Sequence, residues 1–230
     1  MRSATVAIRS RQGSEFAGYL ATPEATGPVP AVVLASTVRG VDADIRAIAD
    51  EFAVSGFLAA APDLFWRSPP GPASSRLQEI RTGEDDMADT LAYLQALPMF
   101  NARAAAMGFC YGGPYAILGP KRLGYAAGIS CHGTRMLDYI DELAGIHAPV
   151  CIAWGDRDSH APAQVLETYR EIPPRMANVE VHVFPGVAHG YMMSRSAHAF
   201  DPAARDFCMA RARAILEGLR SRHVSREAGA

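Results

Sequence analysis

The sequence lacks a long apolar run, an excess of positive charge and a secretory signal. No stretch approaches the roughly 20 apolar residues that cross a bilayer, and the first 16 residues alternate between polar and apolar. We therefore expect a cytoplasmic protein with no membrane partner. The formal net charge of −2 provides no field that would hold a phosphate backbone, so nucleic acid is not an expected partner either.

Closely spaced pairs of metal-binding residues are also missing. The four cysteines, Cys110, Cys131, Cys151 and Cys208, are far apart in the chain and form no Cys-x-x-Cys pair. A chain of this length does not need disulfides to be stable, so reduced thiols are expected. The histidines show no ligand spacing either. We expect no metal and no cofactor, and any role of a cysteine must then come from its local surroundings.

The composition is that of a folded domain. Of the 230 residues, 49% are hydrophobic and 20% charged, which is enough to form one substantial core. No internal repeat or linker is visible. We expect a single domain over residues 1–220 and a frayed polar tail over 221–230, and the sequence leaves open a monomer or a homodimer.

Apolar strands alternate with amphipathic helices along the whole chain. Strands are expected at 5–10, 15–23, 30–36, 57–65, 103–109, 124–133, 149–155 and 178–186. Helices are expected at 42–56, 84–97, 114–119, 137–144, 161–172 and 202–219. Several strands are apolar at every position, which indicates burial on both faces. The pattern predicts an α/β fold, with a mostly parallel sheet covered by helices on both faces and ligands bound beyond the carboxyl ends of the strands.

One motif at such a strand end can carry chemistry. In MGFCYGG (107–113), Cys110 follows an apolar strand and has glycines two residues to either side. A nucleophile on a tight strand-to-helix turn needs small neighbours, and the Tyr111 N–H then lies where an oxyanion would be stabilised. The alternative is that Cys110 is a small buried side chain packed between strand and helix. A free thiol has a pKa of about 8.5, so catalysis would require a partner that activates it.

Candidate partners follow in chain order. Asp156 and Asp158 come after the strand at 149–155, and His189 comes after the strand at 178–186. Nucleophile, acid and histidine in this order are typical of an α/β-hydrolase triad. His132, which follows another strand, either lines the pocket or is a structural histidine.

Five segments, VVLASTVRGVD, AAPDLF, GFCYGG, GDRDSHAP and PGVAHGY, together resemble the dienelactone hydrolase family. The resemblance covers most of the chain, and its specific part is the cysteine in place of the usual serine. It implies an α/β-hydrolase fold with a catalytic triad of Cys110, Asp158 and His189. It also implies an oxyanion hole formed by the Val38 and Tyr111 amides.

The sequence departs from the family pattern at two positions. Thr37 stands where bacterial dienelactone hydrolases carry a glutamate that helps to form the thiolate, and Met193 stands where they carry an arginine for the substrate carboxylate. Candidate replacements for that arginine are Arg39, Arg76, Arg81 and Arg195. Other candidate substrate-binding residues are Thr37, His132 and Trp66, the last on a loop (66–72) that either shapes the pocket or is a solvated connector.

The leading hypothesis is a carboxylic ester hydrolase that cleaves a small-molecule ester or lactone through a thioester on Cys110. A general carboxylesterase or thioesterase is the second hypothesis, because the glutamate and the arginine are missing. The third is a binder of small molecules that retains the fold without catalysis.

Overall fold

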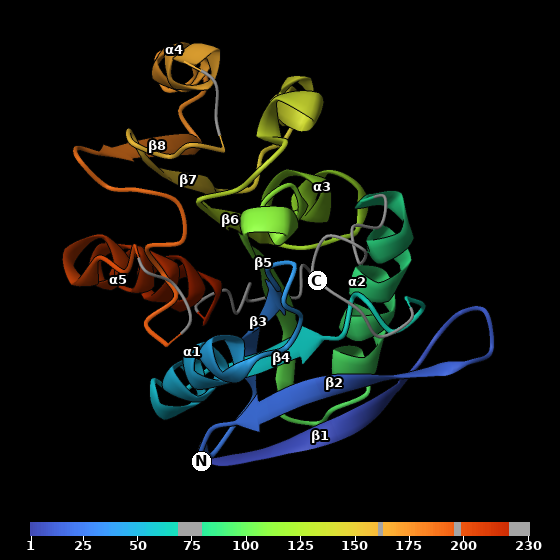
Figure 1. Ribbon diagram of the computed structural model, residues 1–230. Helices are drawn as coiled ribbons and strands as arrows, with labels where there is room; N and C mark the ends of the chain where they lie inside the picture. The colour runs from blue at the N-terminus through green and yellow to red at the C-terminus, as the bar shows by residue number, and fades with distance from the viewer. Residues whose placement is uncertain (69–79, 161–162, 196–198, 221–230) are drawn as a thin grey trace, which may run out of the picture.

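The computed structural model describes residues 1–68, 80–160, 163–195 and 199–220, and these residues form one eight-stranded sheet flanked by helices (Figure 1). The strand order is β1-β2-β4-β3-β5-β6-β7-β8. The first two strands, β1 and β2, form an antiparallel hairpin at one edge of the sheet, β2 pairs antiparallel with β4, and all later pairs are parallel. The predicted mostly parallel sheet is confirmed.

The strands are β1 (Arg2–Arg9), β2 (Glu15–Thr22), β3 (Val29–Ala35), β4 (Leu58–Pro62), β5 (Phe100–Phe109), β6 (Ala127–Cys131), β7 (Val150–Gly155) and β8 (Val179–Phe184). The α-helices are α1 (Ala43–Val54), α2 (Ile80–Gln95), α3 (Tyr115–Arg122), α4 (Ala163–Glu171) and α5 (Pro202–Arg220). Two 3-10 segments, η2 (Cys110–Gly112) and η3 (Met136–Leu143), complete the described elements.

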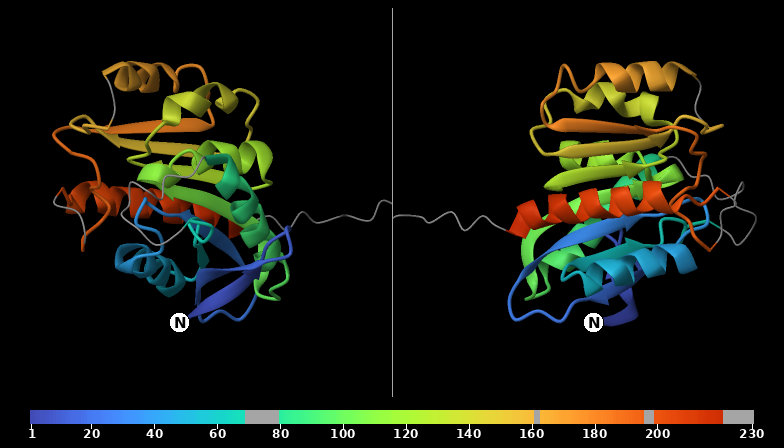
Figure 2. Two further views of the ribbon diagram at one scale, coloured as in Figure 1. Left: turned by 45° about the vertical axis from the view of Figure 1, so that its right-hand side comes forward. Right: turned by 90° about the vertical axis from the view of Figure 1, so that its left-hand side faces the viewer.

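Helices cover both faces of the sheet, as Figure 2 shows most clearly for the long helix α5. Helices α1 and α5 pack on one face, and α2, α3, η3 and α4 pack on the other. Strand β3 is fully buried and contributes to the cores on both faces of the sheet. Val32 and Leu34 face the side of α1 and α5. The side of α2 and α3 is faced by Ala31, Val33 and Ala35. The continuous apolar runs in the sequence follow from this burial on both faces.

Local signals in the sequence explain where α1 begins and ends. The Asp42 carboxylate accepts hydrogen bonds from the backbone N–H groups of Asp44 and Ile45, at 3.0 and 3.1 Å, which makes it the N-cap. The helix ends before Gly56, whose φ of +86° suits a residue without a side chain.

The segment 137–144 differs from its prediction as a regular helix. It forms the 3-10 helix η3 instead, between Arg135 in a left-handed conformation (φ +56°) and Gly145 (φ +77°). At eight residues the segment is longer than most 3-10 helices, and it lies between these two left-handed residues. The expected tail at 221–230 lies outside the described residues.

Candidate active site

Strand β5 ends in a sharp turn that carries Cys110. The backbone φ of Cys110 is +52°, a left-handed conformation that a residue with a side chain seldom adopts. The turn is held by the Cys110 carbonyl, which accepts hydrogen bonds from the N–H groups of Gly113 at 3.0 Å and Thr134 at 2.9 Å. Cys110 is partly exposed, whereas the other three cysteines are buried. The sulfur-bearing residue is therefore presented at the sheet edge on a strained backbone.

The glycines of the motif are required by close backbone contacts. A Cβ atom on Gly108 would lie 1.9 Å from the carbonyl oxygen of Gly112, and one on Gly112 would lie 2.2 Å from the carbonyl oxygen of Ala35. A Cβ atom on Gly113 would lie 2.3 Å from the Cα atom of Gly133. The turn thus closes against β3 on one side and the chain after β6 on the other, and neither side leaves space for a side chain.

His189 and Asp158 form the second part of the site. The Asp158 side chain is fully buried, and its Oδ2 lies 2.7 Å from Nδ1 of His189, whose side chain is 15% exposed. The two loops that carry them are joined by a hydrogen bond of 3.0 Å from the Arg157 N–H to the Val187 carbonyl. The other oxygen of Asp158 accepts the His160 N–H at 2.8 Å.

The charge state of His189 is set by its neighbours. Burial acts to lower the pKa of His189, but the hydrogen bond with Asp158 and the interactions with Cys110 outweigh burial and raise the pKa to about 9. His189 and Cys110 line the same cavity. At neutral pH the structure therefore favours an imidazolium between the carboxylate and the sulfur.

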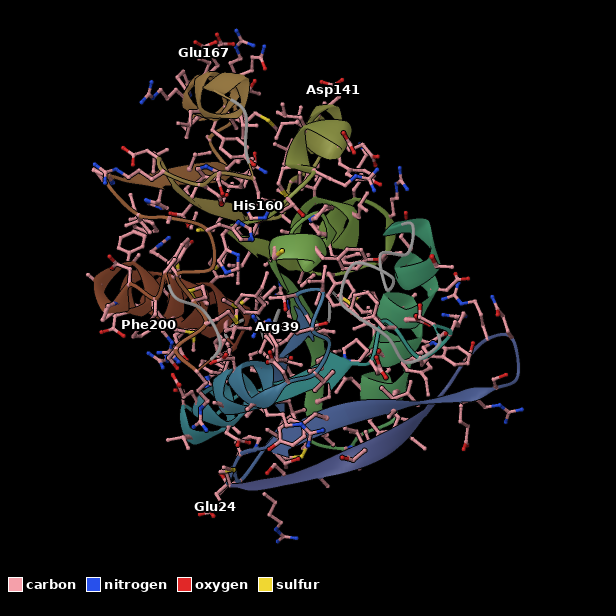
Figure 3. All side chains as sticks on the ribbon, in the orientation of Figure 1. Glu24, Arg39, Asp141, His160, Glu167 and Phe200 are labelled. Carbon is pink, nitrogen blue, oxygen red and sulfur yellow. The ribbon has the colours of Figure 1, made fainter. Side chains whose placement is uncertain are left out.

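A cavity of about 210 Å³ opens beside these groups. Its lining comprises Thr37, Val38, Arg39, Cys110, His132, His160, His189, Gly190 and Met193. Arg39 and His160 are labelled in Figure 3, near the middle of the molecule. The carboxyl ends of β3, β5, β6, β7 and β8 all contribute to this region, as expected for an open parallel sheet.

Comparison with known proteins gives the family. The model of the dienelactone hydrolase family matches residues 16–217, which is most of the chain. The chain belongs to the dienelactone hydrolase family. It is 29% identical to carboxymethylenebutenolidase 1 of Cupriavidus pinatubonensis over 96% of this chain and 99% of that protein. It is 23% identical to the carboxymethylenebutenolidase of Pseudomonas putida over 83% of this chain and 86% of that protein.

Solved structures agree on the fold of this dienelactone hydrolase family member. A candidate dienelactone hydrolase of Klebsiella pneumoniae superposes with a TM-score of 0.79 at 22% identity, covering 94% of this chain and 98% of that one. A dienelactone hydrolase-like promiscuous phosphotriesterase from metagenomic libraries gives a TM-score of 0.76 at 19% identity, with 96% and 100% covered. The predicted α/β-hydrolase fold is confirmed, and the chain is a hydrolase of this family.

Only some of the candidate substrate-binding residues of this hydrolase line the cavity. Thr37, Arg39 and His132 line the cavity, whereas Trp66 and Arg195 are not among its lining residues. The Trp66 indole N–H donates to Asp86 at 3.1 Å, and its ring stacks on Phe16. The side chains of Arg76 and Arg81 lie outside the described residues.

Of the two acid candidates, only Asp158 contacts His189. The Asp156 carboxylate instead accepts the Gly186 N–H at 2.6 Å. His160, which the sequence pattern did not single out, lies with its ring centroid 4.1 Å from that of His189. Its position two residues after Asp158 was the available signal.

The loop that carries His189 is anchored at two points, on β7 and on α1. The Tyr191 hydroxyl donates to the Ala153 carbonyl at 3.1 Å, and the Arg195 N–H donates to the buried carboxylate of Asp44 at 2.8 Å. The first contact joins the loop to β7 and the second joins it to the first turn of α1.

Two groups of possible metal ligands occur among the residues that the structure describes. Asp158, His160 and His189 form one group, and Cys151, Glu180 and His182 form the other, with ligand atoms within 4.8 Å of one another in each. The first group includes Asp158 and His189, which are hydrogen-bonded to each other, so a cation there would compete with this hydrogen bond. In the described part of the chain, no helix has the length and apolar character to cross a membrane.

Proposed function

We propose that this hydrolase cleaves a small ester or lactone through a thioester on Cys110. The proposal is supported above all by Cys110 and His189, which line one cavity, with Cys110 in a left-handed turn and His189 hydrogen-bonded to the buried Asp158. The relatives named carboxymethylenebutenolidase support an ester or lactone as the substrate.

In the first half of the reaction, the Cys110 sulfur attacks the carbonyl carbon. The Val38 and Tyr111 amides stabilise the oxyanion, and the His189 imidazolium gives its proton to the leaving oxygen as the C–O bond breaks. Asp158 holds the ring through Nδ1 and stabilises its positive charge. A lactone keeps its leaving oxygen on the acyl chain, whereas a simple ester releases an alcohol.

In the second half, neutral His189 removes a proton from water, and the water oxygen attacks the thioester carbon. When the C–S bond breaks, the carboxylic acid leaves and the Cys110 sulfur returns beside protonated His189. The acid loses its proton to solvent, so the cycle consumes one water and regenerates the enzyme.

Arg39 supports a substrate with a carboxylate. The residue lines the cavity with its side chain exposed to solvent, and no acidic side chain pairs with it among the residues that the structure describes. An unpaired guanidinium beside the reacting groups favours an anionic group on the substrate. Arg39 is thus the candidate that takes the place of the arginine missing at Met193.

The test is an assay of the wild type and the C110A variant on lactone, aryl ester and acyl-thioester panels. Loss of all turnover in C110A, together with an acylated mass in the wild type only, is the expected result. Full turnover by C110A on every accepted substrate would refute the proposal. Wild-type protein that binds esters without turning them over would indicate the non-catalytic binder.

A general carboxylesterase or thioesterase is the second candidate. Thr37, which is 7% exposed, is a neutral residue at the cavity in place of the family glutamate, and Met193 adds an apolar wall. These two residues favour neutral acyl groups. The same panel separates the candidates, because a preference for neutral aryl esters or thioesters over carboxylate-bearing lactones would select the second.

A further inference from the structure

His132 lines the cavity but has no role in the two halves of the reaction proposed for Cys110. Its side chain is fully buried, and neither ring nitrogen has a hydrogen-bond partner. The ring lies edge-on to the rings of His189 and Tyr191, at centroid distances of 4.9 and 5.1 Å. The Phe109 ring lies further away, at 6.3 Å. A phenyl ring would fill the same aromatic environment without placing two polar atoms in it.

The backbone of His132 is explained by the turn, but its imidazole is not. The φ of His132 is +41°, and the chain that follows brings Gly133 against Gly113 and the Thr134 N–H to the Cys110 carbonyl. This conformation places the side chain next to the reacting groups. Buried polar atoms are nearly always hydrogen-bonded in folded proteins, so two unpartnered nitrogens at a cavity indicate a ligand that supplies the bonds.

The second half of the reaction requires one more hydrogen-bond acceptor than the triad provides. The attacking water has two hydrogens, of which His189 accepts one. The other lining side chains that could accept the second are less suited, because Thr37 Oγ1 already accepts the Arg39 N–H at 3.2 Å and the His160 side chain is 58% exposed. Burial, followed by the charge of His189, lowers the pKa of His132 well below 6.5, so its ring is neutral and keeps an accepting nitrogen.

We propose that His132 is a further catalytic residue, whose free nitrogen accepts a hydrogen bond from the water that hydrolyses the acyl-enzyme. The inference rests on the thioester proposed above. The water gives one proton to His189 and keeps the hydrogen directed at His132 until the tetrahedral intermediate collapses. No proton moves to His132, so the balance of the step is unchanged. The nitrogen orients the water toward the thioester carbon.

The test follows the two halves of the reaction separately, with enzyme in excess over p-nitrophenyl acetate. Release of p-nitrophenol reports acylation, and loss of the acetylated protein mass reports deacylation. In H132F we expect acylation within about twofold of the wild type and deacylation slower by about tenfold, because one hydrogen bond in the transition state is lost. H132N, which keeps an acceptor and suits a left-handed backbone, should recover part of the rate.

Several outcomes decide the matter. Equal slowing of both steps in H132F would overturn the proposal, because it would mean that His132 only positions His189, which acts in both. Unchanged deacylation would overturn it as well. Slowing that depends on the acyl group, measured with acetyl, benzoyl and succinyl esters, would show that the nitrogen binds a substrate oxygen instead of water. H182F, the same change outside the cavity, should leave both steps unaffected.

The thermal midpoint and the C110A variant complete the test. H132F should unfold at a temperature no lower than the wild type, because the substitution removes buried polar atoms without partners. A folded H132F with normal deacylation would refute the role of His132 alone. An acetylated mass in C110A would refute the thioester on Cys110, and with it the role of His132 in hydrolysing that thioester. The two failures are therefore distinguishable.

Discussion

The bond between His189 and Asp158 makes the stability of this protein depend on pH in a defined direction. The pKa of His189 is raised from 6.5 to about 9. A group whose pKa is higher in the folded state contributes stability that is complete below pH 6.5 and is lost as the pH rises to about 9. At roughly 1.4 kcal/mol for each pH unit, the contribution is about 3 kcal/mol.

Solvent screens this pair weakly, because the side chains of His189 and Asp158 are only 15% and 0% exposed. The perturbation is D158N, which keeps a hydrogen-bond acceptor for Nδ1 and removes the charge. Cys110 also contributes to the raised pKa, so the variant removes only part of the effect. We expect the stability advantage of the wild type over D158N to fall by about 1–2 kcal/mol between pH 6 and pH 9.5.

The assay is urea unfolding at half-unit pH intervals, followed by the fluorescence of the buried Trp154. Taking the difference between the two proteins cancels the titration of groups that both contain. D156N is the matched control, since Asp156 bonds the backbone of Gly186 and not the histidine, and its difference from the wild type should not change over this range. A D158N difference that is constant, or that grows with pH, would refute the reasoning.

Three further substitutions have defined outcomes. G108A should lower both stability and turnover, since its Cβ atom would lie 1.9 Å from a carbonyl oxygen. G27A, with nothing within 4 Å of its Cβ atom, should change neither. A thermal melt and an ester assay measure both variants. R39M should raise KM by about two- to fivefold for a carboxylate-bearing ester and leave a neutral ester unchanged, since an exposed charged hydrogen bond is lost. D44A should lower kcat with little effect on KM, because the Arg195 N–H loses its partner; steady-state kinetics would contradict this if kcat stayed constant.

The sequence alone was sufficient to predict the sheet and the residues that meet at its edge. Strands such as β3 and β7 are apolar at every position, and polar residues follow them at once. In a parallel sheet, those positions are neighbours whatever their separation in the chain. Glycines on both sides of Cys110 indicated the turn for the same physical reason that the structure shows, namely the lack of space for a Cβ atom.

Contacts between side chains could not be predicted in this way. That His132 is buried without partners, or that His160 lies over His189, depends on the path of three loops and on how their rings pack. The sequence showed both as histidines after a strand, which many positions share. The 3-10 form of η3 likewise could not be predicted, because the apolar spacing of its residues is also that of a regular helix.

The close backbone packing around the nucleophile has a consequence for engineering. Where main chains touch, no side chain can be added, so the turn offers no positions at which substrate range can be altered. Variation must come from the rim, where Thr37, Arg39, His160 and Met193 face the same cavity from three loops. A small combinatorial library at these four positions should therefore change which acyl groups are accepted while the reacting atoms stay in place.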